Sequence, residues 1–167
     1  MKYSVVIFPS EEIRSMANSL RKRYDSYFHQ IEPYVTLLDP FTLTDEERQS
    51  SSSFLEAVAK DTEAFSLTFH KVGTFHPVTP IVYLAIQEKD ALHHLHQRLS
   101  NGPIQVERKY SFVPHLTVAR DLAEGELLDV YGRLRLRSFQ LACIINQFHL
   151  IKQTADGTWQ VDETFLL

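Results

Sequence analysis

Two short segments of this chain share one pattern, and that repetition constrains the fold more than any other feature of the sequence. Residues 33–36 read Pro-Tyr-Val-Thr, and residues 114–117 read Pro-His-Leu-Thr. The two segments lie about half the length of the 167-residue chain apart. Both continue into apolar residues typical of a short β-strand. The chain is therefore predicted to fold as two similar halves, each of which supplies one such strand.

Strand-like and helix-like segments alternate along both halves. Runs of β-branched and aromatic residues predict strands at 2–9, 34–38, 64–75, 81–86, 111–119, 139–153 and 158–167. Helical spacing of apolar residues, with capping residues at the starts, predicts helices at 11–25, 44–60, 89–100 and 123–134. The last two strands are expected to form a hairpin around residues 155–157. This order predicts an α+β fold. We expect one domain, residues 1–167, with two pseudo-symmetric lobes whose antiparallel sheets surround a central cleft, and with helices outside.

The charge balance limits the partners of the chain. Its 17 Lys and Arg residues against 21 Asp and Glu residues give a net charge of −4, so no overall basic field attracts a long nucleic acid. An RNA or nucleotide would have to bind at a local patch. The single cysteine, Cys143, lies in an apolar run and cannot form an internal disulfide. With no signal-peptide core and no run of about 18 apolar residues, the sequence predicts a soluble cytoplasmic protein without a membrane partner.

The repeated strand pattern carries the candidate chemistry. Because side chains at i and i+2 of a strand point to the same face, His115 projects with Thr117, and Tyr34 projects with Thr36. A hydroxyl can donate to a phosphoryl oxygen while an imidazole moves a proton. Two such pairs facing each other across the cleft would flank one phosphodiester. No glycine-rich phosphate loop, paired-cysteine motif or serine nucleophile motif offers another site.

Three histidines in the helix predicted at 89–100 form a second cluster. His93 and His96 are spaced i, i+3 and share a helix face, so they could form the edge of a metal site. No carboxylate follows at ligand spacing, and a solvated helix face is the favoured interpretation. We therefore predict no metal and no cofactor.

The chain resembles the two-histidine phosphoesterase superfamily, which includes bacterial 2′-5′ RNA ligase-like proteins and cyclic phosphodiesterases. The order of elements agrees, and the resemblance is carried by VVIFPS, GTFHPVTPIVYL and FVPHLTVAR. The family pattern is a pair of H-x-T motifs, each at the end of a strand. His115-Leu116-Thr117 matches the second motif, and Arg120 stands where relatives often carry Arg or Gln. The resemblance implies action on RNA ends or nucleotide phosphodiesters that carry a 2′,3′-cyclic phosphate or a 2′-5′ linkage.

The first motif departs from the family pattern. Tyr34 stands where the family has its first histidine, Leu38 occupies a position that is often basic, and only Thr36 is retained. Tyrosine has a reference pKa of about 10, so at neutral pH it can donate a hydrogen bond but is a poor base. Imidazole, with a pKa of about 6.5, can do both. The sequence predicts a phosphoesterase with impaired activity, or alternatively a catalytically inactive binding module for nucleotides or RNA ends.

Three arrangements are open for the site. In the first, Tyr34 donates a proton and His115 acts as the base. In the second, His76 replaces the missing histidine, because its loop resembles the family's cleft-side loop. In the third, the cleft only binds a phosphate-containing ligand through His115, Arg120 and the two threonines.

The candidate site residues fall into two groups. The predicted catalytic residues are His115, Thr117, Tyr34 and Thr36, and the predicted substrate-binding residues are Arg120, His76 and Phe75. Phe75 could stack on a base, although burial in the core explains an aromatic there equally well. Tyr34 and His115 also have structural interpretations, as a core aromatic and as a hydrogen-bonded core histidine. No metal is needed, because hydroxyls, an imidazole and Arg120 would meet the charge on a phosphate.

Overall fold

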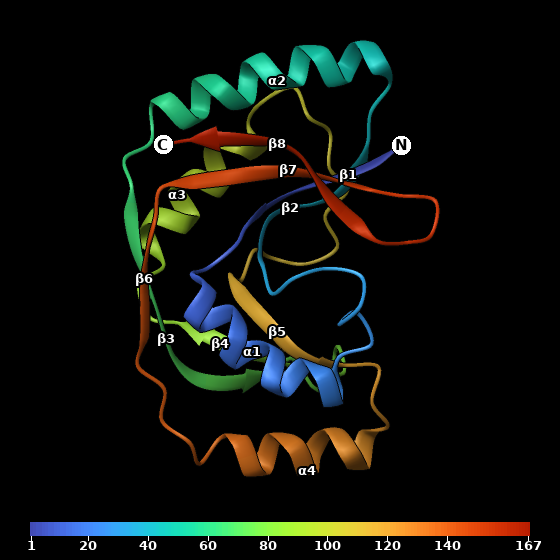
Figure 1. The fold of residues 1–167 in the computed structure, drawn as a ribbon, viewed down its shortest axis with the longest axis vertical. Helices are drawn as coiled ribbons and strands as arrows, with labels where there is room; N and C mark the ends of the chain where they lie inside the picture. The colour runs from blue at the N-terminus through green and yellow to red at the C-terminus, as the bar shows by residue number, and fades with distance from the viewer.

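Two four-stranded antiparallel sheets form the centre of the protein, and four helices surround them (Figure 1). The computed structural model describes residues 1–167. The first sheet has the order β2-β1-β7-β8 and contains β1 (Lys2–Ile7), β2 (Val35–Thr42), β7 (Gln147–Gln153) and β8 (Trp159–Leu166). The second has the order β5-β4-β3-β6 and contains β3 (Phe65–Thr74), β4 (Ile81–Ile86), β5 (His115–Arg120) and β6 (Leu141–Ile145). The helices are α1 (Glu11–Tyr24), α2 (Asp45–Lys60), α3 (Asp90–Ser100) and α4 (Glu124–Leu134). The predicted α+β architecture is confirmed.

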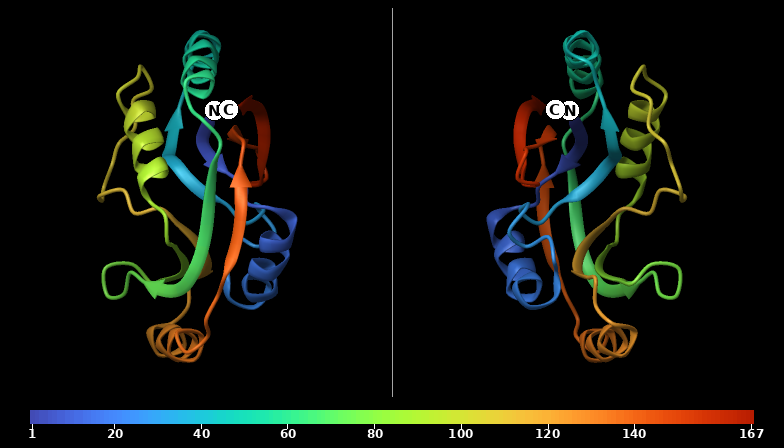
Figure 2. Two further views of the ribbon diagram at one scale, coloured as in Figure 1. Left: turned by 90° about the vertical axis from the view of Figure 1, so that its left-hand side faces the viewer. Right: turned by 90° about the vertical axis from the view of Figure 1, so that its right-hand side faces the viewer.

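The two sheets are built alike, and this places the repeated segments at equivalent positions. β2 is an edge strand that pairs with β1, and β5 is an edge strand that pairs with β4. The helix that follows β1, α1, packs against β5, and the helix that follows β4, α3, packs against β2. The side views place α1 and α3 on opposite sides of the strands, with α2 and α4 at opposite ends (Figure 2). The edge strands β2 and β5 approach each other between them.

One apolar core holds both edge strands in place. A cluster of 34 buried residues includes Leu37 of β2 and Leu116 of β5, together with Phe69 and Phe148 from the inner strands. Full burial of such a side chain contributes about 1.5–3 kcal/mol. The neighbouring residues on the other face of each edge strand, Thr36 and His115, are only half-buried. These two positions are thus partly open, whereas Thr117, on the same face of β5 as His115, is buried.

Helix α2 begins where its capping box predicts. The Thr44 hydroxyl accepts a hydrogen bond from the Glu47 backbone N–H at 3.2 Å, and the Glu47 carboxylate accepts one from the Thr44 N–H at 2.8 Å. These two bonds satisfy backbone donors that the first turn of a helix leaves free. None of the four helices combines the length and the apolar character needed to cross a bilayer.

Several predicted strand boundaries are wrong, and β5 begins at His115 rather than at residue 111. The segment 139–153 is not one strand, because β6 pairs with β3 in one sheet and β7 pairs with β1 in the other, with Asn146 between them. Its continuous apolar pattern hides the change of sheet. β2 also continues through Pro40, beyond the predicted end at residue 38. An edge strand tolerates proline because its outer N–H groups have no ladder partner.

Candidate active site

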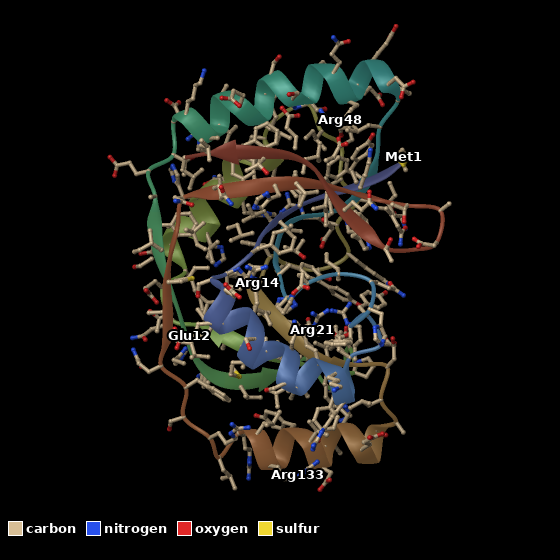
Figure 3. All side chains as sticks on the ribbon, in the orientation of Figure 1. Met1, Glu12, Arg14, Arg21, Arg48 and Arg133 are labelled. Atoms are coloured by element: carbon tan, nitrogen blue, oxygen red, sulfur yellow. The ribbon has the colours of Figure 1, made fainter.

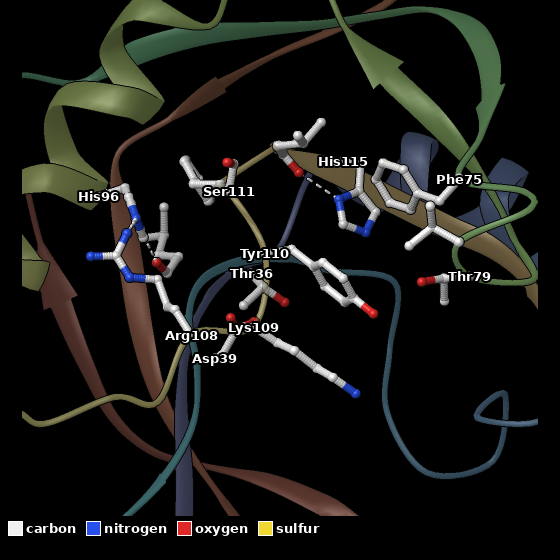
Figure 4. A pocket seen from close by; sticks show the side chains of 14 residues that line it. Thr36, Asp39, Phe75, Thr79, His96, Arg108, Lys109, Tyr110, Ser111 and His115 are labelled. Atoms are coloured by element: carbon white, nitrogen blue, oxygen red, sulfur yellow. Dashed lines mark hydrogen bonds between the residues drawn. The ribbon is translucent and has the colours of Figure 1, made fainter.

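A cavity of about 370 Å³ opens beside both edge strands (Figure 4). β2 contributes Thr36 and Asp39, and β5 contributes His115. Side chains from the loop 108–113 and from the segment 75–79 after β3 complete the wall. The volume falls within the range of about 300–1,000 Å³ that small-molecule sites occupy. No group of three or more His, Cys, Asp or Glu side chains is arranged to hold a metal ion.

His115 presents one ring nitrogen to this cavity. Its Nδ1 lies 2.6 Å from the Val113 carbonyl oxygen, and because a carbonyl only accepts, Nδ1 carries the proton in this bond. Nε2 is then left with a lone pair, and Figure 4 shows this side of the ring turned toward the cavity. Burial lowers the pKa of His115 below its usual 6.5, and the positive charge of Arg120 lowers it further. The imidazole is therefore neutral at pH 7 and suited to accept a proton at Nε2.

Two aromatic rings fix the orientation of this imidazole. Phe75 packs edge-on against His115 with ring centroids 4.9 Å apart, and Tyr83 of β4 does so at 5.2 Å. Tyr83 lies across from Gly73 of β3, where an added Cβ would come within 2.6 Å of the tyrosine ring. The absence of a side chain at position 73 thus makes room for the ring that supports His115. Phe75 also lines the cavity, so its position agrees with a ligand-contacting role.

Tyr34 opens onto a second, smaller hollow of about 160 Å³. It directly precedes β2 and packs against the small apolar cluster of Val6, Ile31 and Ile151. Thr36 lines both the cavity and the second hollow, so its hydroxyl lies between the spaces that His115 and Tyr34 face. Thr117 is buried and lines neither space. The structure thus gathers His115, Thr36 and Tyr34 around one region and sets Thr117 deeper.

Arg120 lies next to the Tyr34 hydroxyl and lines neither space. Its Nε forms an ion pair with Asp25 Oδ1 at 2.8 Å, and its guanidinium stacks over the Tyr27 ring at 4.0 Å from the centroid. Burial opposes the charged form, but the nearby Tyr34 hydroxyl and the Asp25 carboxylate outweigh it and raise the pKa of Arg120. The guanidinium therefore stays charged beside Tyr34, in a supporting position rather than at the wall of the cavity.

A buried arginine completes this support. Arg21 projects from α1 (Figure 3) and its Nε donates to Asp25 Oδ2 at 2.9 Å. Another nitrogen of the same guanidinium donates to the Ile31 carbonyl at 2.8 Å. The Arg21 and Asp25 side chains are 1% and 0% exposed. The ion pairs from Arg21 to Asp25 and from Asp25 to Arg120 connect α1 with the end of β5.

His76 does not lie opposite His115. Its Nε2 is 3.6 Å from Glu124 Oε1 of α4, and the residue is absent from the walls of both the cavity and the second hollow. The arrangement in which His76 replaces the missing histidine therefore has no geometric support. Among the expected substrate-binding residues, Phe75 alone lines the cavity.

His96 was missed as a cavity residue, and the expectation of a solvated helix face is wrong for it. Its ring is buried, stacks on Phe112 at 3.8 Å and has Nδ1 at 2.6 Å from the Leu37 carbonyl oxygen of β2. Its Nε2 accepts from Arg108 at 2.9 Å (Figure 4). A signal existed in the sequence, because positions 92, 95, 96 and 99 follow the i, i+3, i+4, i+7 pattern of a buried helix face. His96 thus ties the loop that covers the cavity to strand β2.

We expect the stability of the protein to decrease as the pH is lowered from about 7.5 to about 5.5, because its buried histidines resist protonation. Burial lowers the pKa of His96 below 6.5, as does the charge of Arg108, and burial also lowers the pKa of His149. Below pH 6.5 the unfolded chain binds protons that the folded chain does not, so the free energy of unfolding decreases as the pH falls. Thermal unfolding of His96→Gln should show a smaller decrease than the native protein. The exposed His94→Gln should show the full decrease, and equal decreases in both variants would contradict the prediction.

Two four-stranded sheets place their edge strands beside one cavity, and one of these strands carries a histidine. This arrangement defines a class of two-lobed α+β proteins. A sequence model described as the 2′-5′ RNA ligase superfamily matches residues 8–157. The chain is 44% identical over 167 residues to a candidate phosphoesterase of Bacillus mycoides strain KBAB4. The match covers 100% of this chain and 97% of the relative. A candidate phosphoesterase of Geobacillus sp. strain WCH70 is 39% identical, over 100% of this chain and 96% of its own length. The chain belongs to the 2′-5′ RNA ligase superfamily.

Solved structures show the same fold at low sequence identity. E. coli LigT complexed with 3′-AMP superimposes with a TM-score of 0.75 and 16% identity, over 99% of this chain and 97% of LigT. TT0787 of Thermus thermophilus superimposes with a TM-score of 0.71 and 16% identity, over 100% of this chain and 98% of that protein. The whole length of the chain therefore takes part in the shared fold.

Proposed function

We propose that this protein is a phosphoesterase that acts on RNA or nucleotide phosphodiesters with a 2′,3′-cyclic phosphate or a 2′-5′ linkage. The observation that carries the proposal is the His115 imidazole, whose Nδ1 is held by the Val113 carbonyl and whose Nε2 is open to the cavity. Two further findings support it. The similar Bacillus and Geobacillus proteins are named as candidate phosphoesterases. LigT, which shares the fold, has been crystallised with 3′-AMP, with NADP+ and with ATP.

In the proposed reaction, Nε2 of His115 removes a proton from an attacking water as its oxygen bonds to phosphorus. The bond from phosphorus to the ribose oxygen breaks, and that oxygen must receive a proton. Tyr34 lines the adjoining hollow on the other side of Thr36, with the Arg120 guanidinium beside it, and its hydroxyl is the candidate donor. The Thr36 hydroxyl can donate to a phosphoryl oxygen between them. Thr117 and Arg120 would act indirectly. Thr117 would position strand β5, and Arg120 would position Tyr34.

This assignment also explains why activity would be impaired. A phenol with a pKa of about 10 can donate to a leaving oxygen, but it is a weaker acid than an imidazolium and donates less readily. Because the phenol stays protonated at pH 7, it cannot act as a base there. Tyr34 can therefore donate a proton but cannot accept one, so the proposed site catalyses one direction of the reaction more readily than the reverse. We expect turnover below that of a site with two imidazoles.

A second candidate function follows from the same residue. If Tyr34 cannot supply the proton, the site becomes a catalytically inactive binding module for nucleotides or RNA ends. The cavity, the Thr36 hydroxyl and the basic side chains of Arg108 and Lys109 in its wall would still hold a phosphate-containing ligand. An assay of turnover separates the two functions.

We expect Tyr34→His to raise hydrolysis of a short RNA that ends in a 2′,3′-cyclic phosphate by about tenfold or more. A positioned acid or base contributes about 10²–10⁴ in rate, and a new imidazole without tuned partners would recover part of this factor. The measurement is initial rate beside Tyr34→Phe, which keeps the ring and removes the hydroxyl. A native rate that drops in Tyr34→Phe would identify the tyrosine as the donor. Absence of native turnover with a gain in Tyr34→His would favour the binding module, and no turnover in any variant would contradict the proposed function.

A further inference from the structure

The second hollow has a composition suited to an anion. Its polar wall includes the Lys2 ammonium and the carboxamides of Gln30 and Gln153, and no Asp or Glu lines it. None of the ion pairs of the protein involves Lys2. The next lysine on the adjoining strand, Lys152, is instead paired with Asp162 at 3.2 Å. Lys2 thus supplies an uncompensated positive charge at the wall of a hollow that carries no negative one.

The carboxamides add donors to this charge. Gln153 uses one of its two N–H groups on the Gly157 carbonyl at 3.1 Å, so the other is free for a ligand. Gln30 lies beside it, and its backbone carbonyl accepts from the Trp159 N–H at 2.8 Å, which joins the segment before β2 to β8. A cation with neighbouring amide donors is an arrangement that binds phosphate oxygens.

Size and position indicate that the hollow holds part of a ligand rather than a whole one. Its volume of about 160 Å³ is below the range of about 300–1,000 Å³ of complete small-molecule sites. It shares Thr36 with the main cavity, and Tyr34 stands in its wall. A ligand whose reacting phosphodiester lies at Thr36 can therefore reach it without leaving the protein surface.

We propose that the hollow lined by Lys2, Gln30 and Gln153 is a subsite for a second phosphate group, so that the preferred ligand is a phosphodiester that carries an additional phosphate. This inference rests on the proposed function, because it places the reacting phosphodiester at Thr36. The additional phosphate belongs either to a longer oligonucleotide or to a bisphosphorylated mononucleotide, that is, a nucleoside 2′,3′-cyclic phosphate that also carries a 5′-phosphate. Both sources share the same chemistry, and the experiment separates them.

The test is equilibrium binding of two pairs of probes. One pair is 2′-5′-linked diadenosine with and without a terminal phosphate, and the other is adenosine 2′,3′-cyclic phosphate with and without a 5′-phosphate. For the native protein, we expect the added phosphate to tighten binding by about three- to fivefold at low salt, the effect of one exposed ion pair. A gain in the first pair indicates an oligonucleotide, and a gain in the second indicates a bisphosphorylated nucleotide. Higher salt should reduce either gain.

Two matched variants identify the residue responsible. Lys2→Gln removes the charge at the hollow and should abolish the gain, whereas Lys152→Gln removes a charge on the neighbouring strand and should keep it. No gain in the native protein, or a gain that survives in Lys2→Gln, would overturn the subsite. Hydrolysis of the unphosphorylated diadenosine by the native protein is measured in parallel. Hydrolysis without a Lys2-dependent gain in binding would support the proposed function and refute the subsite. A Lys2-dependent gain in binding without hydrolysis would support the subsite and contradict the proposed function.

Discussion

Replacement of His115 by alanine is expected to lower turnover of an RNA that ends in a 2′,3′-cyclic phosphate by about 10²–10⁴, the contribution of one positioned acid or base. The physical reason is the arrangement of the ring. Val113 holds the proton on Nδ1, burial keeps the ring neutral, and only Nε2 is left to accept a proton from water. No other imidazole takes its place, since His76 faces Glu124 and both ring nitrogens of His96 already have partners. The measurement is single-turnover hydrolysis, which reports the chemical step directly.

A matched control and a pH profile make the result specific to the imidazole. His94→Ala removes an exposed histidine of α3 and should leave the rate unchanged. Because burial and the charge of Arg120 lower the pKa of His115 below 6.5, its basic form persists into mildly acidic solution. The native rate should therefore hold at pH 6.5 and fall only at lower pH, as the ring becomes protonated. A rate that is equal in native protein and His115→Ala would rule out His115 as the base.

The fold was largely predictable because local and long-range signals agree. The capping box at Thr44 marks the start of α2, and turn residues separate β7 from β8. The repeated Pro-x-x-Thr segments imply two strands in equivalent places, and the sheet orders show that both are edge strands. The change of sheet at Asn146 was not predictable. Strands β6 and β7 are both apolar and nearly continuous in sequence, and only pairing with β3 or β1 distinguishes them.

The site was predictable only where a single strand determines it. Alternation along a strand places His115 and Thr36 at the cavity wall. The same argument predicted Thr117 beside His115, yet Thr117 is buried and lines neither space. The roles of Arg120 and His96 depend on partners that are distant in sequence, namely Asp25 and Leu37. Arg120 was predicted to bind substrate. In the structure it pairs with Asp25, lies next to Tyr34 and lines neither the cavity nor the second hollow. Tertiary pairing of this kind leaves no periodic signal, although the apolar stripe of α3 did offer one for His96.

The buried carboxylate of Asp25 sits between two guanidinium groups, and the stability of the region depends on it. Arg21 reaches one carboxylate oxygen at 2.9 Å and Arg120 reaches the other at 2.8 Å. Asp25 also accepts from the Tyr27 backbone N–H at 2.9 Å and forms a parallel bridge with Arg120. Removal of the carboxylate would leave two buried cations without their shared counter-charge. Breaking a buried ion pair from one side costs about 3–5 kcal/mol, because the remaining charge stays desolvated.

We therefore expect Asp25→Ala to lower the free energy of unfolding by about 3–5 kcal/mol. The corresponding fall in Tm is roughly 6–20 °C, at about 2–4 °C per kcal/mol for a chain of this size. Thermal and urea unfolding would measure it. Asp61→Ala is the matched control, since its carboxylate is 79% exposed and pairs with Arg98 at the surface, where a lost ion pair costs about 0–1 kcal/mol. The double variant Arg21→Met/Asp25→Leu should be less destabilised than Asp25→Ala, because it removes one of the unpaired charges and fills the space. An Asp25→Ala protein as stable as the Asp61→Ala control would mean that α1 and β5 are held by apolar packing alone, and that Arg120 can support Tyr34 without its counter-ion.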